Sequence, residues 1–341
     1  MNLKKIIAFA LILTFVLAMT FVRLPYFAFR PGSVNELSRR IIVSKGESFK
    51  PAGEIHFTTI KQDSSINGWE FIQGTFKDSV HLVDESAVLG VRDRDQNRNY
   101  NFELMRVSKS TAVAVALTYL GLEPYKATGV GMVSVEGPAK GILTTADVVI
   151  SVDGEKVFTD EDLIFQIRKN KPGEVIQLGI ENIDGSNPRK ISIELGKRED
   201  NETLAFLGIA PQTRLEDNKD IPIEVSVNTG RVGGNSAGLA LTLAVLDVLT
   251  PGELTAGLEV ATTGTIDLSG NVGPIGGVVQ KAITARKAGM DLFLVPESIF
   301  EEAIRHSGED MKVKGVANLQ EALEVLTEFG GNGNSLKIPK L

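Results

Sequence analysis

Cysteine is absent from this chain of 341 residues, and histidine occurs only at His56, His81 and His306. Without cysteine the protein cannot form disulfide bonds, use a thiol nucleophile or bind zinc through thiolates. The histidines do not fall in an HExxH pattern or any comparable ligand spacing. A GxxxxGK[ST] sequence is also missing, so the chain has no P-loop to hold nucleotide phosphates. We therefore expect no metal ion and no other cofactor.

Basic residues are outnumbered by acidic residues, 36 against 43, which gives a net charge of −7 and a pI near 5.3. Nucleic-acid binding needs a basic face for the phosphates, and no long run of lysine or arginine occurs. Nucleic acid is therefore excluded as the main partner. The contents of 43% hydrophobic and 23% charged residues are ordinary for a folded protein. The length allows two or three domains.

The N-terminus carries an uncharged, apolar run from Ile6 to Val22 after two lysines. Its length is at the lower edge of a spanning helix, and no small-x-small cleavage site is evident. We expect one transmembrane helix as an anchor over residues 1–24, followed by a linker over 25–53. A cleaved signal peptide and a buried core helix are the alternatives. Basic residues flank the run on both sides, so the positive-inside rule does not fix its orientation.

The rest of the chain mixes strand and helix patterns, so we expect an α+β fold. The segments EIHFTTI at 54–60 and IEVSV at 223–227 have strand character. Asn101–Leu120 has apolar residues at helical spacing and ends at Gly121. The tail over 331–341 is rich in glycine and asparagine, and we expect it to be flexible.

Residues 125–200 resemble a PDZ domain. The resemblance rests on GMVSV, GPAKGIL, ADVVISVDGEKV, a helix at 160–169, KPGEVIQLGIEN and ISIEL, in that order. A PDZ domain binds an extended chain as an additional strand beside a helix. The resemblance therefore implies a peptide-binding groove formed by Val130, Gly131, Met132, Val133, Leu163 and Ile167. Another small β-rich domain is the alternative.

A glycine-rich turn, GGNSAG at 233–238, leads directly into an apolar helix. Ser236 in this turn lies at the helix N-terminus, where unpaired N–H groups and the helix dipole stabilise negative charge. Such N–H groups form an oxyanion hole in many hydrolases. Ser236 is therefore a candidate nucleophile, with Gly234, Asn235 and Ala237 in supporting positions. An N-cap serine in a tight turn is the alternative.

A second element follows downstream, where PIGG at 274–277 opens a helix over 278–288. Lys281 shares one surface of this helix with apolar residues, namely Val278, Ala282, Ala285 and Ala288. Burial among apolar groups destabilises the charged amine and lowers its pKa, so that a lysine accepts a proton near neutral pH. The alternative is a lysine that extends its ammonium group into water.

Together these two segments resemble the proteolytic domain of the Lon family. The serine motif ending in SAG, the Thr-Gly pair at Thr263, PIGG and the lysine helix occur in the family's order and spacing. The resemblance implies a dyad of Ser236 and Lys281, with Thr263 orienting the lysine. The sequence departs from the family pattern at Gly233 and Asn235, where an acidic residue and a proline are usual.

The resemblance also implies a domain order. Residues 54–124 look like the first part of a Lon-type domain and 201–330 like its catalytic part, so the PDZ domain at 125–200 would be an insertion. This arrangement resembles the bacterial, membrane-anchored PDZ-containing Lon-like proteases. It implies an ATP-independent serine endopeptidase that cleaves unfolded or flexible protein segments, with PDZ-assisted binding or gating. It also implies a catalytic part outside the cytoplasm, and it is compatible with a homo-oligomer.

Two other functions fit parts of the sequence. GNSAG matches GxSxG, the nucleophile elbow of α/β-hydrolase esterases, for which Asp291 and His306 would complete a triad. No HGGG-like segment accompanies it. The chain could also be a non-catalytic PDZ scaffold. The presence of Ser236, Lys281 and Thr263 together argues against this alternative.

Overall fold

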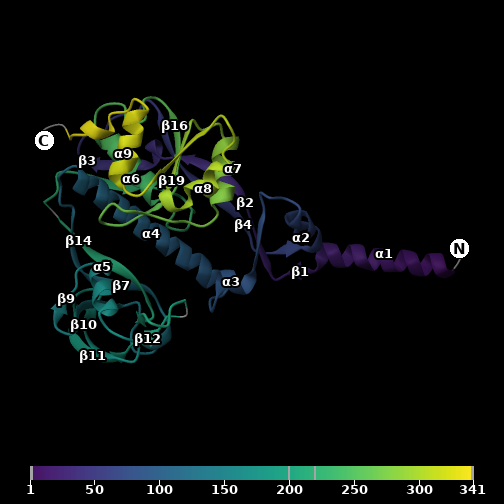
Figure 1. The fold of residues 1–341 in the computed structure, drawn as a ribbon, viewed down its shortest axis with the longest axis horizontal. Helices are drawn as coiled ribbons and strands as arrows, with labels where there is room; N and C mark the ends of the chain where they lie inside the picture. The colour runs from purple at the N-terminus through teal and green to yellow at the C-terminus, as the bar shows by residue number, and fades with distance from the viewer. Residues whose placement is uncertain (1–2, 199, 219, 339–341) are drawn as a thin grey trace. The chain divides into compact units, whose positions relative to one another are not determined.

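The computed structural model describes residues 3–198, 200–218 and 220–338. The chain divides into two compact units (Figure 1). The first combines Met1–Gly121 with Pro222–Leu341, and the second, Leu122–Ile221, interrupts it in sequence. The inserted unit is thus longer than the 125–200 expected from sequence, because it includes the strands up to residue 217.

The first unit is built on a six-stranded mixed sheet. In spatial order its strands are β20 (Lys312–Val316), β19 (Leu292–Pro296), β16 (Glu259–Thr262), β4 (Glu54–Asp63), β2 (Tyr26–Glu36) and β6 (His81–Asp84). The four from β20 to β4 are parallel, and β2 is antiparallel to both of its neighbours. All five residues of β19, LFLVP, are buried, as expected for a central parallel strand with both faces covered.

The segment predicted as a linker, 25–53, is not a linker. It contains β2 of the main sheet and β3 (Ile41–Lys45), which pairs with β15 (Glu224–Val227). Pro31-Gly32 lies at a bulge within β2, where the register to β4 shifts. Gly32 is required there, because a Cβ would lie 2.5 Å from the Thr59 carbonyl oxygen.

The first unit also contains the helices α4 (Arg94–Tyr119), α6 (Gly238–Leu249), α7 (Val278–Lys287) and α9 (Leu319–Glu328). α4 begins earlier than predicted because Asp93 and Gln96 form a capping box there. Every residue of α6 is buried, in keeping with a helix that is apolar all round. Asn318 caps α9 by accepting a hydrogen bond from the Glu321 amide.

Shorter elements fill the remainder of this unit: β1 (Arg23–Leu24), β5 (Ile66–Asn67), α2 (Gly68–Thr75), α3 (Glu85–Leu89), β17 (Thr265–Ile266), β18 (Val272–Gly273) and α8 (Phe300–Ile304). The start of the tail predicted to be flexible packs against the domain. The amide of Asn332 donates to the Glu253 carbonyl, and its side chain donates to the Pro251 carbonyl. The last three tail positions lie outside the described residues.

α1 (Leu3–Phe21) occupies the segment that the sequence predicted as a transmembrane anchor. Among the residues that the structure describes, no helix has both the length and the apolarity needed to cross a bilayer. The first two positions of the predicted anchor, 1–2, lie outside the described residues.

The second unit is a β-rich fold with one α-helix. Its main sheet has the order β11 (Arg189–Glu194), β10 (Val175–Asn182), β8 (Asp147–Val152), β7 (Tyr125–Val135) and β14 (Ile209–Asp217), with β9 (Glu155–Lys156) beside β8. β12 (Gly196–Lys197) pairs with β13 (Ala205–Phe206). α5 (Asp160–Arg168) begins at Thr159 with a capping box and buries Leu163 and Ile167 in the core of this unit.

The groove predicted along β7 is wrong in its position. β14 pairs with β7 from Tyr125 to Val135, and β8 lies on the other side at Val130, so strand addition has no free edge there. Of the residues assigned to the groove, four belong to the core: Val130, Met132, Leu163 and Ile167. The sheet ends at β14 instead, and Thr213 of this strand accepts a hydrogen bond from the amide of Asp160 at the start of α5.

Asp247 is a buried carboxyl group inside α6, and burial raises its pKa from 3.8 to about 7, with Glu253 adding to the rise. The folded chain therefore holds this proton more tightly than the unfolded chain, so Asp247 lowers stability progressively as the pH rises from about 4 to 7. We expect Asp247→Asn to raise the free energy of unfolding at pH 8, by up to about 4 kcal/mol. Urea unfolding at pH 5 and pH 8 measures this. An equal gain at both pH values would contradict it.

Candidate active site

Ser236, Lys281 and Thr263 meet at the N-terminal end of α6. The Lys281 Nζ lies 2.6 Å from the Ser236 Oγ and 2.9 Å from the Thr263 Oγ1. The Thr263 hydroxyl in turn donates to the Ser236 carbonyl oxygen, at 3.1 Å, and the amide of Gly264 donates to the same oxygen. The structure thus brings together the three side chains that the sequence singled out, from three separate segments.

Lys281 is almost completely buried, with 2% of its surface exposed. Burial lowers the pKa of its amine from 10.5 to about 7, because the charged form loses its hydration. In the described part of the chain, Lys281 forms no ion pair with a carboxylate that would stabilise its charged form. A large fraction of the amine is therefore neutral at physiological pH and able to accept a proton.

The turn before Ser236 is fixed by α4. The Gly234 amide donates to the Asn101 carbonyl at 2.7 Å, and the Ser108 hydroxyl donates to the Asn235 carbonyl at 3.2 Å. Gly234 has φ +90°, a conformation that favours glycine. At Gly233, where the Lon family usually has an acidic residue, a Cβ would lie 2.9 Å from the Asn101 Cβ, so α4 leaves no room for a side chain.

Asn101 and Ser108 are the residues that sequence reasoning missed. They lie more than 100 positions before the turn that they hold, so no local motif connects them to it. The one available signal is a polar side chain on the apolar face of a helix: Ser108 is buried between apolar turns of α4.

Backbone donors are available beside the nucleophile. The amides of Ser236 and Ala237 precede the first residue of α6, and neither has an acceptor within the described residues. Unpaired amides at a helix start stabilise negative charge. Of the supporting residues predicted from sequence, Ala237 contributes such an amide, whereas Gly234 and Asn235 hold the turn through their backbone contacts with α4.

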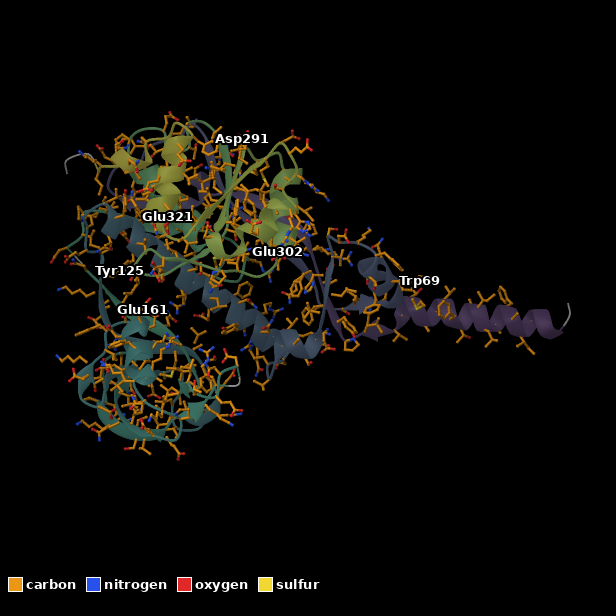
Figure 2. All side chains as sticks on the ribbon, viewed as in Figure 1. Trp69, Tyr125, Glu161, Asp291, Glu302 and Glu321 are labelled. Atoms are coloured by element: carbon orange, nitrogen blue, oxygen red, sulfur yellow. The ribbon has the colours of Figure 1, made fainter. Side chains whose placement is uncertain are left out.

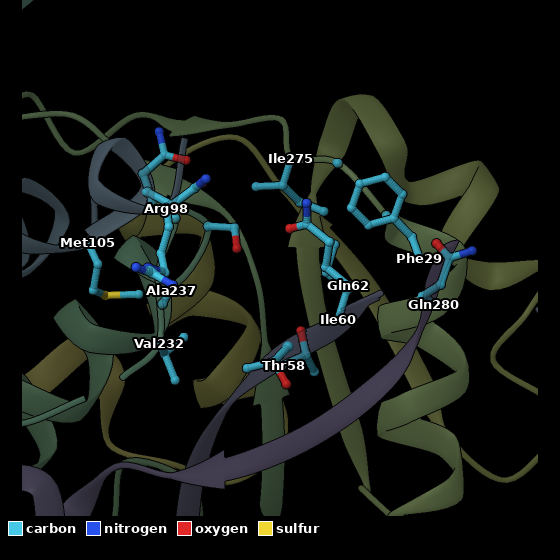
Figure 3. Close-up of a pocket in the computed structure, with 18 of the residues that line it drawn as sticks. Phe29, Thr58, Ile60, Gln62, Arg98, Met105, Val232, Ala237, Ile275 and Gln280 are labelled. Atoms are coloured by element: carbon cyan, nitrogen blue, oxygen red, sulfur yellow. The ribbon is translucent and has the colours of Figure 1, made fainter. Parts of the chain in front are cut away.

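Ser236 lines a cleft of roughly 1140 Å³ within the first unit. Figure 3 shows Arg98, Met105 and Ala237 on one side of this cleft and Phe29, Gln62 and Ile275 on the other. Its walls are contributed by β2, β4, α4, the serine turn and the start of α7. Asp291 and His306, which an esterase triad would need, are not among the described residues that line it.

Glu54, His56 and Glu259 form a cluster with the ligand types of a metal site. The His56 Nε2 lies 2.7 Å from a Glu259 oxygen and 3.4 Å from a Glu54 oxygen. A histidine bound to a metal normally donates its other ring N–H to an acceptor. The buried Nδ1 of His56 has no such acceptor in the described part of the chain, so we assign no metal to this cluster.

Comparison with known proteins gives one family match. Residues 205–328 match the Lon protease (S16) C-terminal proteolytic domain. The chain is 33% identical over 140 residues to the Lon protease of Helicobacter pylori strain J99, covering 37% of this chain and 17% of that protein. It is 30% identical over 119 residues to the archaeal Lon protease of Methanocaldococcus jannaschii, covering 35% and 18%. The chain thus spans less than a fifth of the length of these two relatives.

Two of the solved structures similar to part of the chain are PDZ domains. That of the SdrC-like protein of Listeria innocua is 26% identical with a TM-score of 0.22, covering 24% of this chain and 92% of that one. That of Listeria monocytogenes is 22% identical with a TM-score of 0.22, covering 25% and 87%. The family match, with the dyad geometry, supports a serine peptidase whose catalytic region resembles the Lon proteolytic domain.

Proposed function

We propose that this chain is an ATP-independent serine endopeptidase that cleaves unfolded or flexible protein segments with a dyad of Ser236 and Lys281. One observation carries the proposal: the amine of a buried lysine, with its pKa lowered to about 7, lies 2.6 Å from the hydroxyl of a serine in an open cleft. A structural lysine gains nothing from such burial, whereas a general base requires it.

In the proposed reaction, the neutral Lys281 amine takes the proton of Ser236 as the serine oxygen attacks a peptide carbonyl. The amides of Ser236 and Ala237 stabilise the oxyanion that forms. The Lys281 ammonium then gives its proton to the leaving amine, and the acyl-enzyme is hydrolysed by water that the same amine activates. Thr263 keeps the Nζ in line with the hydroxyl through its own hydrogen bond.

The cleft suits an extended peptide because β4 offers it an edge that is unpaired within the described sheet. β16 pairs with β4 only as far as Thr262, opposite Phe57, whereas β4 continues to Asp63. The consecutive residues 58–60 all line the cleft. Successive side chains of a strand point to opposite faces of the sheet, so a cleft over one face would be lined by every second residue only. The cleft therefore meets β4 along its edge. A substrate without secondary structure of its own can pair there, which supports unfolded segments as substrates. We propose unfolded segments rather than folded proteins as substrates, as the Lon-like resemblance of a sequence without a P-loop implies.

The second unit is proposed to bind or gate substrates by strand addition at β14. The outer edge of β14 is free in the described sheet, and α5 begins beside it. Replacement of residues 122–221 by a short linker is expected to slow cleavage of protein substrates more than cleavage of short peptides. Unchanged rates and selectivity on casein would remove this part of the proposal.

We further propose that α1 attaches the chain to a membrane, with the catalytic part outside the cytoplasm, as the Lon-like resemblance implies. Its apolar side chains are exposed along the helix (Figure 2), among them Phe9, Leu11 and Phe15. Exposed apolar surface of this extent is typical of contact with lipid. Alkaline carbonate extraction of cell membranes, with and without residues 1–24, tests the attachment. Protease accessibility in intact cells tests the side.

The full chain should be incubated with casein beside Ser236→Ala and Lys281→Ala variants. Cleavage by the parent that both variants lose is the expected result. Cleavage that survives Ser236→Ala would overturn the proposed nucleophile. Light scattering of the same preparations reports the homo-oligomer that the Lon resemblance leads us to propose.

The pH dependence of cleavage follows from the pKa of Lys281. Only the neutral amine is a base, so we expect kcat/KM for a peptide without ionisable side chains to rise about tenfold per pH unit below pH 7 and to level off above it. A profile that is flat between pH 5 and 9 would contradict a lysine base.

A further inference from the structure

The cleft around Ser236 is lined by more basic than acidic residues, although the chain as a whole is negative. Acidic residues outnumber basic ones 43 to 36 in the sequence. Among the described residues that line the cleft, the balance is reversed. The basic ones are Arg94, Arg98, Arg231 and Lys281, with His81 beside them, and the acidic one is Asp95.

Two of the three arginines are neutralised by neighbours. The Arg94 Nε lies 2.6 Å from a Glu85 oxygen, and the Arg98 Nη2 lies 3.1 Å from an Asp95 oxygen. The side chain of Arg231 is exposed and has no hydrogen bond or ion pair within the described part of the chain. Its guanidinium therefore keeps all of its donors available for a ligand.

The backbone around Arg231 is held at both ends. The Gly230 amide donates to the Asn228 Oδ1 at 3.0 Å, and the Gly234 amide donates to the Asn101 carbonyl at 2.7 Å. Ser236 lies five positions after Arg231, so even a straight segment would place their Cα atoms within about 17 Å. An extended substrate advances about 3.3 Å per residue, so Arg231 can reach a side chain within roughly five residues of the scissile bond.

We propose that Arg231 makes this site selective for peptide segments that carry a glutamate or aspartate close to the cleaved bond. This inference rests on the proposed peptidase function and names the substrates of that site. A guanidinium binds a carboxylate through two parallel hydrogen bonds. Phe27, Phe57 and Met105 line the same cleft and give it apolar walls for the other side chains of the substrate.

The test uses fluorogenic peptides in matched pairs that differ only by Glu or Gln at successive positions on either side of the cleaved bond. At one of these positions we expect the wild-type chain to cleave the Glu peptide about tenfold faster in kcat/KM. Arg231→Lys should keep only part of the preference, because it retains the charge but not the two parallel hydrogen bonds. Arg231→Glu should reverse the preference in favour of a Lys peptide. Arg305→Gln, which replaces an exposed arginine that does not line the cleft, should keep it fully.

Two results overturn the selectivity but leave the proposed function intact, provided that Ser236→Ala abolishes cleavage. The first is equal cleavage rates for the Glu and Gln peptides at every position. The second is a preference for Glu that Arg231→Glu leaves unchanged. Binding supplies a readout that needs no turnover. Fluorescence anisotropy of the same peptides on Ser236→Ala should show a lower Kd for Glu than for Gln, and equal Kd values also overturn it. Cleavage that survives Ser236→Ala overturns the proposed function instead, and this inference with it.

Discussion

Replacing Lys281 by methionine is expected to reduce casein cleavage by about four orders of magnitude, close to the loss caused by Ser236→Ala. Methionine matches the aliphatic stem of lysine and brings no charge into the interior, where Lys281 is 2% exposed. The variant should therefore fold, with Ser236 present and no base to take its proton. Lys281→Arg should be equally inactive, because a guanidinium does not deprotonate in proteins.

Lys287→Met is the matched control, since it removes an exposed lysine from the same helix. We expect it to retain activity and stability. The stability of Lys281→Met should exceed that of the parent at pH 6, because the parent must bury an ammonium group there that the unfolded chain leaves in water. Cleavage retained by Lys281→Met would show that another group is the base.

The candidate site was accessible to sequence analysis because its chemistry lies in short, contiguous segments. GGNSAG combines a glycine turn with an apolar helix, and PIGG precedes a helix on which Lys281 shares its surface with alanines. Each segment predicts its own local structure, and their resemblance to the Lon family in order and spacing implied the pairing of Ser236 with Lys281. The 2.6 Å contact between their side chains is information that only the structure supplies.

The fold was less accessible where partners are far apart in sequence. β14 contains Pro211, which argues against a strand within a sheet, but β14 is an edge strand and the register to β7 shifts at that proline. Its partner lies some 80 residues earlier in the chain, so no local pattern placed it beside β7 and the groove was predicted on the wrong edge. In the same way, the pairing of β2 with β4 and β6 turned an apparent linker into part of the central sheet.

Gly233→Ala, which adds one methyl group to the turn before the nucleophile, is expected to lower kcat by about a hundredfold. The new Cβ would lie 2.9 Å from the Asn101 Cβ and 3.2 Å from its carbonyl carbon, and neither atom is the end of a flexible side chain that could turn away. The turn must therefore move away from α4 and carry the Ser236 hydroxyl out of its contact with Lys281. Displacements of about 1 Å in a reacting group reduce rates by about this factor.

Gly276→Ala provides the comparison for this substitution. Gly276 lines the same cleft, but its added Cβ would meet no atom within 4 Å, so the variant should lose far less activity. Both substitutions replace a hydrogen by a methyl group at a glycine without positive φ. The difference in their activity therefore reports the steric clash with α4. Measuring kcat and KM for both variants on one fluorogenic peptide separates displacement of the nucleophile, which lowers kcat, from obstruction of the cleft, which raises KM. Equal kcat values for the two variants would mean that α4 does not position the serine turn, and the role assigned to Asn101 would fall.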